Sequence, residues 1–243
     1  MVLTSDLKAL QRLWFQALTS VDAKTLQRLW FQAVVFQDTL VGRDKSIRFF
    51  QYVARLLSGI TNMQVFANLL SALALSRKTL RFGRQLKLAK NIRECYLGEQ
   101  DSMNRITTIL EDGSFLIYCF IDHLCFSERI KLLKLSPRHS DMLDRFAEVF
   151  WITEAAPALL REFRAYVSGG GADVGSTQWH ERRDRAKLLI LKLCCDLACA
   201  LYFVQCSSWR NRRRHKVWCG FLGAIASAVS IKMNWPRECI EVA

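Results

Sequence analysis

The stretch LLSALALSRKTLRFGRQLKLAK, at Leu69–Lys90, combines regularly spaced apolar residues with many cations and no carboxylate. At 100° per residue, a helix built from it would gather three large apolar side chains on one face. These three side chains are Leu75, Phe82 and Leu86. The cations that fall outside this face are Arg77, Lys78, Arg81, Arg84 and Lys87. The pattern therefore predicts a basic amphipathic helix.

A helix that carries only cations on its polar side needs an anion from elsewhere. Ordinary surface helices mix both signs, because Glu–Lys pairs four residues apart support the helix. A phospholipid membrane would supply the anion, since the apolar face can reach the acyl boundary while the cations meet phosphates. We therefore expect the three apolar residues to insert into an acidic phospholipid membrane and the five cations to bind its headgroups. The alternative is a core helix with a solvated basic side.

The composition favours an all-α protein with acidic partners. The 243 residues are 51% hydrophobic, with a mean hydropathy of +0.07 and a formal net charge of +13. Such a charge fits lipid headgroups, nucleic acid or an acidic protein. We expect no nucleic-acid partner, because nucleic-acid binding would leave the apolar C-terminal part without a purpose. Three prolines, 11 glycines and little strict alternation favour helices, and nine cysteines, most in apolar runs, favour a reducing compartment over a disulfide framework.

The segment VWCGFLGAIASAVSI, at Val217–Ile231, contains no charge and follows a dense basic cluster. It is shorter than the roughly 20 residues of a typical span, but flanking lysines can snorkel and flanking tryptophans can anchor it. We therefore predict a C-terminal transmembrane helix over residues 217–235. Small residues recur along it at a spacing that lets helices approach closely, which favours a homo-oligomer. These helix-packing residues are Gly220, Gly223, Ala224, Ser227 and Ala228.

The chain divides into four regions by composition. Its N-terminus repeats LQRLWFQA at Leu10–Ala17 and Leu26–Ala33, which we interpret as a local duplication of an amphipathic helix. A Gly-rich segment is typical of a flexible linker. The expected divisions are the duplicated N-terminal segment 1–41, a helical region 42–167, the linker 168–178 and the C-terminal helices 179–243.

Several local features carry further expectations. Asp122 lies in the apolar run Phe115–Phe126, where it needs a neighbouring helix, a water-filled gap or protonation to lower its cost. His123 and Lys192 are candidate partners. Lys192 and Asp196 are four residues apart and can pair on one helix face. The polar residues 95–104 predict a loop, and residues 141–166 predict a helix pair interrupted at Pro157.

No pattern in the sequence supports catalysis. The four histidines are scattered, and no cysteine pair has the spacing of zinc ligands. The Gly169–Gly171 run lacks the Lys-Ser/Thr of a phosphate-binding loop. We therefore expect neither an enzyme nor a cofactor nor a metal site.

Several segments in order resemble the peroxin-11 family of peroxisomal membrane proteins. The second and fourth of them are the more specific. They are GRDKSIRFFQYVARLLSG at Gly42–Gly59, SRKTLRFGRQL at Ser76–Leu86, FLIYCFIDHLCFSERIKLL at Phe115–Leu133, and LKLCCDLACAL with GFLGAIASAVSI at Leu191–Leu201 and Gly220–Ile231.

The resemblance implies a helical integral protein of the peroxisomal or glycosomal membrane. Such proteins elongate the membrane before fission, often as homo-oligomers and together with the membrane fission machinery. An alternative implied function is a pore for small metabolites, for which Asp122, Lys192 and Asp196 are the candidate lining residues. The resemblance also implies a second crossing near Phe115–Leu133 with both termini in the cytosol, whereas the residues alone predict one span.

Overall fold

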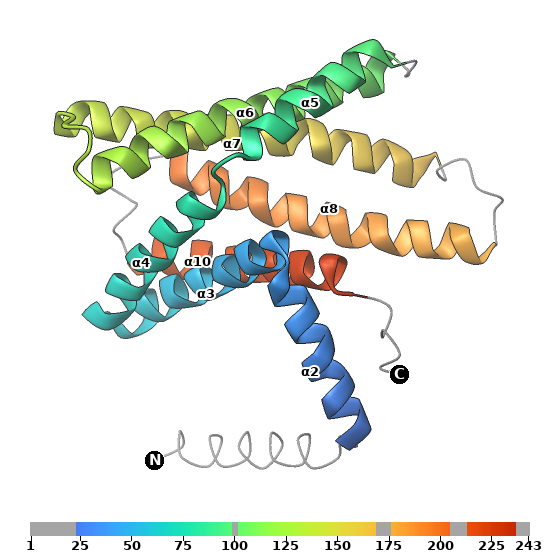
Figure 1. Ribbon diagram of the computed structural model, residues 1–243, viewed down its shortest axis with the longest axis horizontal. Coiled ribbons are helices and arrows are strands. Elements are labelled where there is room, and N and C mark those ends of the chain that lie inside the picture. Colours follow the sequence, from blue (N-terminus) through green and yellow to red (C-terminus); the bar gives the residue numbers. More distant parts are fainter. Residues whose placement is uncertain (1–22, 99–101, 169–175, 205–212, 237–243) are drawn as a thin grey trace. The chain divides into compact units, whose positions relative to one another are not determined.

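The computed structural model describes residues 23–98, 102–168, 176–204 and 213–236 of the chain (Figure 1). Every secondary-structure element in these ranges is an α-helix, which confirms the predicted all-α class. The first copy of the duplication, the Gly169–Gly171 run and residues 205–212 lie outside the described residues. The helices are α2 (Ala23–Asp38), α3 (Leu40–Thr61), α4 (Gln64–Leu80), α5 (Arg84–Leu97), α6 (Ser102–Arg129), α7 (Pro137–Val167), α8 (Thr177–Val204) and α10 (Arg213–Asn234).

The chain forms two compact units, one of residues 1–43 and 234–243 and one of residues 44–233. In the smaller unit, α2 contains the second copy of the duplicated motif, so this copy is helical as expected. Phe36 at the end of α2 packs on Trp235, with ring centroids 5.3 Å apart. The indole nitrogen of Trp235 donates to Gln32 Oε1 at 3.1 Å.

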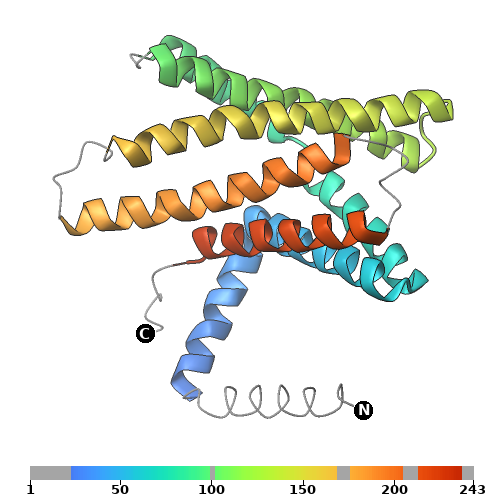
Figure 2. The same cartoon turned by 180° about the vertical axis from the view of Figure 1, so that it is seen from behind.

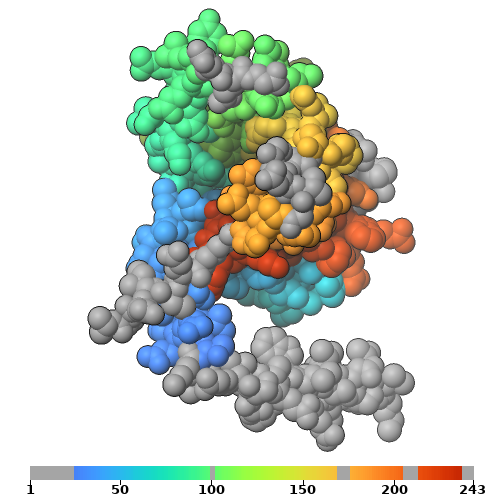
Figure 3. Space-filling model, turned by 90° about the vertical axis from the view of Figure 1, so that its right-hand side faces the viewer, coloured from blue at the N-terminus to red at the C-terminus, as the bar shows by residue number. Residues whose placement is uncertain are grey.

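The larger unit contains four helices that pack in sequence order: α5 on α6, α6 on α7, and α7 on α8. Figures 1 and 2 show the long helices α6, α7 and α8 running side by side from opposite viewpoints. Figure 3 shows one face of this unit, on which the green of α5 and α6, the yellow of α7 and the orange of α8 follow one another. Helix α4 also contacts α6, so both halves of the predicted basic segment pack on α6.

The basic segment Leu69–Lys90 is not one helix, which corrects the sequence-based prediction. Helix α4 ends at Leu80 and α5 begins at Arg84. Between them Gly83 has φ of 80°, a left-handed conformation that glycine adopts without steric cost. The amide of Phe82 donates to the carbonyl of Thr79 at 3.2 Å, so the chain tightens into a turn before the new helix starts.

Two other local predictions are also wrong. Helix α7 continues through Pro157 from residue 137 to 167 and is not a helix pair. Ser136 caps its N-terminus, since its side chain accepts a hydrogen bond from the amide of His139 at 3.4 Å. The predicted loop at residues 95–104 is wrong at both ends, because residues 95–97 belong to α5 and residues 102–104 to α6.

Helix α10 contains most of the predicted span 217–235 and, of the described helices, is the one long and apolar enough to cross a membrane. Its small residues lie against α3 of the same chain. A Cβ added to Gly220 would lie 2.5 Å from the backbone nitrogen of Leu56, and one added to Gly223 would lie 2.1 Å from the ring of Tyr52. Among the other predicted packing residues, Ser227 is buried, Ala224 is half-buried and Ala228 is exposed.

Candidate functional site

The cations at the end of α4 point into the protein. Arg77 Nε lies 3.2 Å from Asp44 Oδ1 on α3, and its Nη1 donates to Gln51 Oε1 at 2.8 Å. Both Arg77 and Asp44 are buried. Burial opposes ionisation of Asp44, but the nearby guanidinium groups of Arg77 and Arg81 outweigh it and hold the pKa of Asp44 well below its usual range.

Asp122 on α6 binds the next two cations, Lys78 in the last turn of α4 and Arg81 at its C-cap. Its carboxylate forms ion pairs with Lys78 and Arg81, and the Arg81 Nη1–Oδ2 distance is 2.5 Å. Arg81 Nη1 also donates to the hydroxyl of Tyr118 at 3.0 Å. Lys78 and Arg81 lie three residues apart and therefore face α6 together. A neighbouring helix thus compensates Asp122, one of the predicted alternatives, but through Lys78 and Arg81 and not through the candidate partners His123 and Lys192.

These contacts correct the reasoning that the basic segment needs an external anion. For Arg77, Lys78 and Arg81 the anions are internal, because Asp44 and Asp122 supply them from α3 and α6. The three predicted headgroup ligands are thus occupied in this arrangement.

The beginning of α5 presents the exposed part of the predicted site. Phe82 and Leu86 expose 54% and 78% of their surface, and Arg84 and Lys87 beside them are exposed too. One face of the Phe82 ring stacks on His123, with centroids 4.0 Å apart. Leu75, the third predicted insertion residue, is half-buried. The structure therefore leaves two of the three apolar residues and two of the five cations exposed within residues 82–87.

A cavity of about 350 Å³ lies between α3, α4, α6, α7 and α8 in the larger unit. Asp196 on α8 pairs in its wall with Lys192 at 3.2 Å, as predicted, and also with Arg48 on α3. The pore candidates Asp122, Lys192 and Asp196 all line this cavity.

Sequence reasoning missed the polar residues of α3 that line the cavity. A signal for them was present, since they recur at intervals of three or four residues and therefore share one face of the helix. They are Asp44, Arg48, Gln51 and Arg55.

The comparison that decides the family covers most of the chain. A sequence model of the peroxisomal biogenesis factor 11 (PEX11) family matches residues 31–235. The chain belongs to the PEX11 family. This match confirms the resemblance found in the sequence, including all the segments that carried it.

Two relatives illustrate the range of similarity within the PEX11 family. Peroxisomal membrane protein PMP30A of Candida boidinii is 29% identical over 140 residues, which are 53% of this chain and 55% of the relative. The chain thus spans about half the length of that relative. Peroxisomal membrane protein 11-4 of Oryza sativa subsp. indica is 26% identical over 219 residues, 84% of this chain and 95% of the relative. No solved structure matches the chain. The names of these relatives agree with the expected location in the peroxisomal membrane.

Proposed function

We propose that this PEX11-family protein elongates the peroxisomal membrane during proliferation and fission by inserting the start of α5 into an acidic leaflet. The observation that carries the proposal is the joint exposure of Phe82, Leu86 and the nearby cations Arg84 and Lys87 at the start of α5. Apolar side chains at this position reach the acyl boundary while the cations meet phosphates. Insertion into one leaflet expands that leaflet and bends the membrane.

Insertion of the longer predicted segment requires a change in the ion pairs of α4. Lys78 and Arg81 reach headgroups only after they leave Asp122. The backbone would change conformation at Gly83, because a glycine can move from its left-handed conformation to a helical one. A straightened α4–α5 helix would then present Leu75 together with Phe82 and Leu86. Lipid phosphates replace the carboxylate as partners of the released cations.

The experiment uses the full chain reconstituted into vesicles of phosphatidylcholine with and without phosphatidylserine. Electron microscopy should show tubules in the acidic vesicles, and Leu86→Asp should abolish them because it places a charge on the inserting surface. Leu160→Asp is the matched control, since Leu160 is an exposed leucine on α7 that is 49% accessible. Equal tubulation by the two variants would refute insertion by α5.

Two kinds of partner accompany this function. A second copy of the chain would concentrate insertion on one membrane region, and the membrane fission machinery would act on the elongated membrane. Crosslinking of the reconstituted protein tests the first, and recovery of fission proteins with tagged organelle-bound protein tests the second.

A pore for small metabolites is the second candidate function. The observation in its favour is that Asp122, Lys192 and Asp196 line one polar cavity. Single-channel recording of the reconstituted chain in planar bilayers tests it. Solute-dependent conductance that Lys192→Gln alters would support a pore, whereas tubulation without conductance would leave elongation as the function.

A further inference from the structure

The cavity of the larger unit contains more positive than negative charge. Nine lysine and arginine side chains line it, against six carboxylates. The excess positive charge arises at three carboxylates, each of which forms ion pairs with two cations. These groups are Asp44 with Lys45 and Arg77, Asp122 with Lys78 and Arg81, and Asp196 with Arg48 and Lys192.

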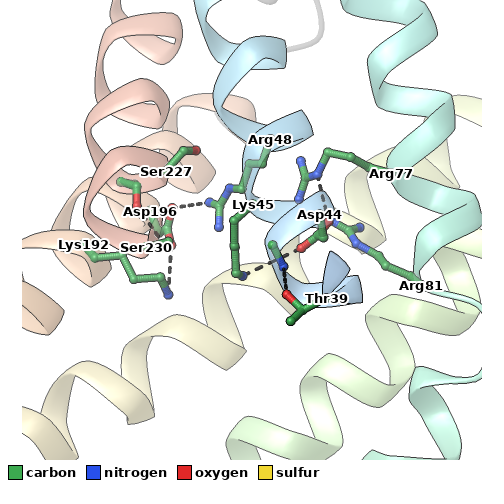
Figure 4. Close-up of polar contacts among 12 residues, drawn as sticks. Thr39, Asp44, Lys45, Arg48, Arg77, Arg81, Lys192, Asp196, Ser227 and Ser230 are labelled. Carbon is green, nitrogen blue, oxygen red and sulfur yellow. Dashed lines mark hydrogen bonds and ion pairs between the residues drawn. The ribbon is translucent and has the colours of Figure 1, made fainter. Parts of the chain in front are cut away.

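Lys45 and Arg48 bring this excess into the centre of the cavity wall. They lie three residues apart on α3, and Figure 4 shows them between Asp44 on one side and Asp196 with Lys192 on the other. The ammonium group of Lys45 has a distant ion pair, 3.8 Å from Asp44 Oδ2. The buried Nε of Arg48 has no hydrogen-bond partner among the described residues. Two donors of the wall are therefore weakly satisfied or unsatisfied.

An ion-pair network that served packing alone would balance its charges. Buried cations are costly unless an anion compensates them, and the cost rises when several cations share one carboxylate. The lowered pKa of Lys45 shows that the charged form of its ammonium group is destabilised here. Burial lowers it to about 7, Asp44 opposes the change, and the cations Arg48, Lys192 and Arg84 add to it. Glu154 on α7 also lies in the wall, and burial raises the pKa of its carboxyl group.

We propose that the cavity is a binding site for a phosphate-bearing anion, held by Lys45, Arg48 and Lys192. A dianion compensates the excess charge better than a monoanion, and ammonium and guanidinium groups form strong charge-assisted hydrogen bonds to phosphate oxygens. The volume of about 350 Å³ lies within the range of small-molecule sites. The lining residues Ser71, Arg84 and Arg129 are exposed, so the cavity reaches the protein surface.

The phosphate group could belong to a phospholipid headgroup or to a free small molecule. The two sources are separated by titrating the full chain in neutral detergent with inorganic phosphate and with short-chain phosphatidic acid at about pH 8. Saturable binding of both with similar affinity indicates that the phosphate group suffices. Much tighter binding of the lipid indicates a headgroup, and no saturable binding of either overturns the proposal.

Variants of Lys45 assign the site. Lys45→Gln should weaken binding by at least about tenfold, because a charge-assisted contact is lost. Lys187→Gln, which removes an exposed cation of α8 outside the cavity lining, should leave the affinity unchanged. An equal loss in the two variants would show that general positive charge attracts the anion, and would overturn the assignment. Leu86→Asp separates the cavity from membrane insertion, since it should abolish tubules and leave phosphate binding intact.

Proton uptake gives a second test that does not depend on Lys45→Gln folding. With a pKa of about 7, Lys45 is roughly one-tenth protonated at about pH 8 and nine-tenths at about pH 6. Binding of sulfate, a tetrahedral dianion whose own charge stays constant in this range, should take up nearly one proton at the higher pH and little at the lower. Calorimetry in two buffers of different ionisation enthalpy measures this uptake.

Lys45→Arg is the matched variant for the proton test. Arginine keeps the positive charge at both pH values, so the variant should bind sulfate without proton uptake. Uptake that persists in Lys45→Arg would show that another group titrates, and would overturn the role given to Lys45.

Discussion

Replacement of Gly220 by alanine is expected to destabilise the protein, because α10 lies against the backbone of α3 there. The new Cβ would lie 2.5 Å from the backbone nitrogen of Leu56 and 2.6 Å from its Cα. Backbone atoms cannot move aside by changing a rotamer, so the two helices must separate. Overpacking of this kind costs about 1–3 kcal/mol, against which alanine gains about 0.5–1 kcal/mol in helix propensity. The free energy of unfolding should therefore fall.

Gly113→Ala is the matched control for this substitution. Gly113 lies inside α6, and a Cβ added there would meet no described atom within 4 Å. The same chemical change should thus stabilise the protein by about 0.5–1 kcal/mol. The difference between the two variants isolates the close approach of α10 to α3.

Thermal unfolding of the detergent-solubilised protein, followed by circular dichroism, measures both effects. For a chain of this size, 1 kcal/mol shifts Tm by about 2–4 °C. Tm should fall for Gly220→Ala and rise for Gly113→Ala. A Gly220→Ala protein that is as stable as Gly113→Ala would refute the intrachain contact. Loss of crosslinked dimer at unchanged Tm would instead assign Gly220 to a contact between copies.

Three further outcomes follow from the buried charges and the exposed side of α10. The pKa of Lys45 is 10.5 in the unfolded chain and about 7 in the folded protein. Between these two pH values the unfolded chain therefore binds more protons than the folded protein. The free energy of unfolding should therefore rise with pH there, by up to about 1.4 kcal/mol per pH unit, and Lys45→Met should remove the rise in denaturant titrations. Asp122→Asn should cost about 3–5 kcal/mol, since buried Arg81 and half-buried Lys78 lose their carboxylate. Asp184→Asn, in an exposed pair, should leave the free energy of unfolding nearly unchanged in the same titrations. If copies associate through the exposed side of α10, Ala228→Leu should reduce crosslinked dimer without changing Tm; unchanged crosslinking would move that interface elsewhere.

Local patterns in the sequence predicted much of the fold but not which elements would become neighbours. The uncharged run Val217–Ile231 predicted α10, and the spacing of Lys192 and Asp196 predicted their ion pair. The partners of the α4 cations could not be found in this way, because Asp44 and Asp122 lie 33 and 44 positions from the cations they bind. A periodic pattern indicates which side chains share a face, but packing decides what that face meets.

Whether Gly83 and Pro157 end a helix depends on how the surrounding helices pack. Gly83 ends a helix although the apolar pattern continues past it, because the turn lets α4 and α5 each pack on α6. Pro157 does not end a helix although proline removes a backbone donor, and Ala155 and Ala158 beside it are buried. In both places tertiary packing outweighed the local preference.

The ion pairs of α4 set a condition on membrane insertion. Breaking the buried pairs of Asp122 costs about 3–5 kcal/mol, whereas each cation near an acidic surface gains only about 1 kcal/mol. The two released cations therefore do not open the structure by themselves. Arg84 and Lys87 add about 2 kcal/mol at an acidic surface, and burial of the exposed parts of Phe82 and Leu86 adds about 1–2 kcal/mol each. Because these four residues are already exposed, their gains favour insertion of the start of α5 without breaking the Asp122 pairs. Release of Lys78 and Arg81 therefore needs the additional burial of Leu75, and a neutral membrane should leave Asp122 paired.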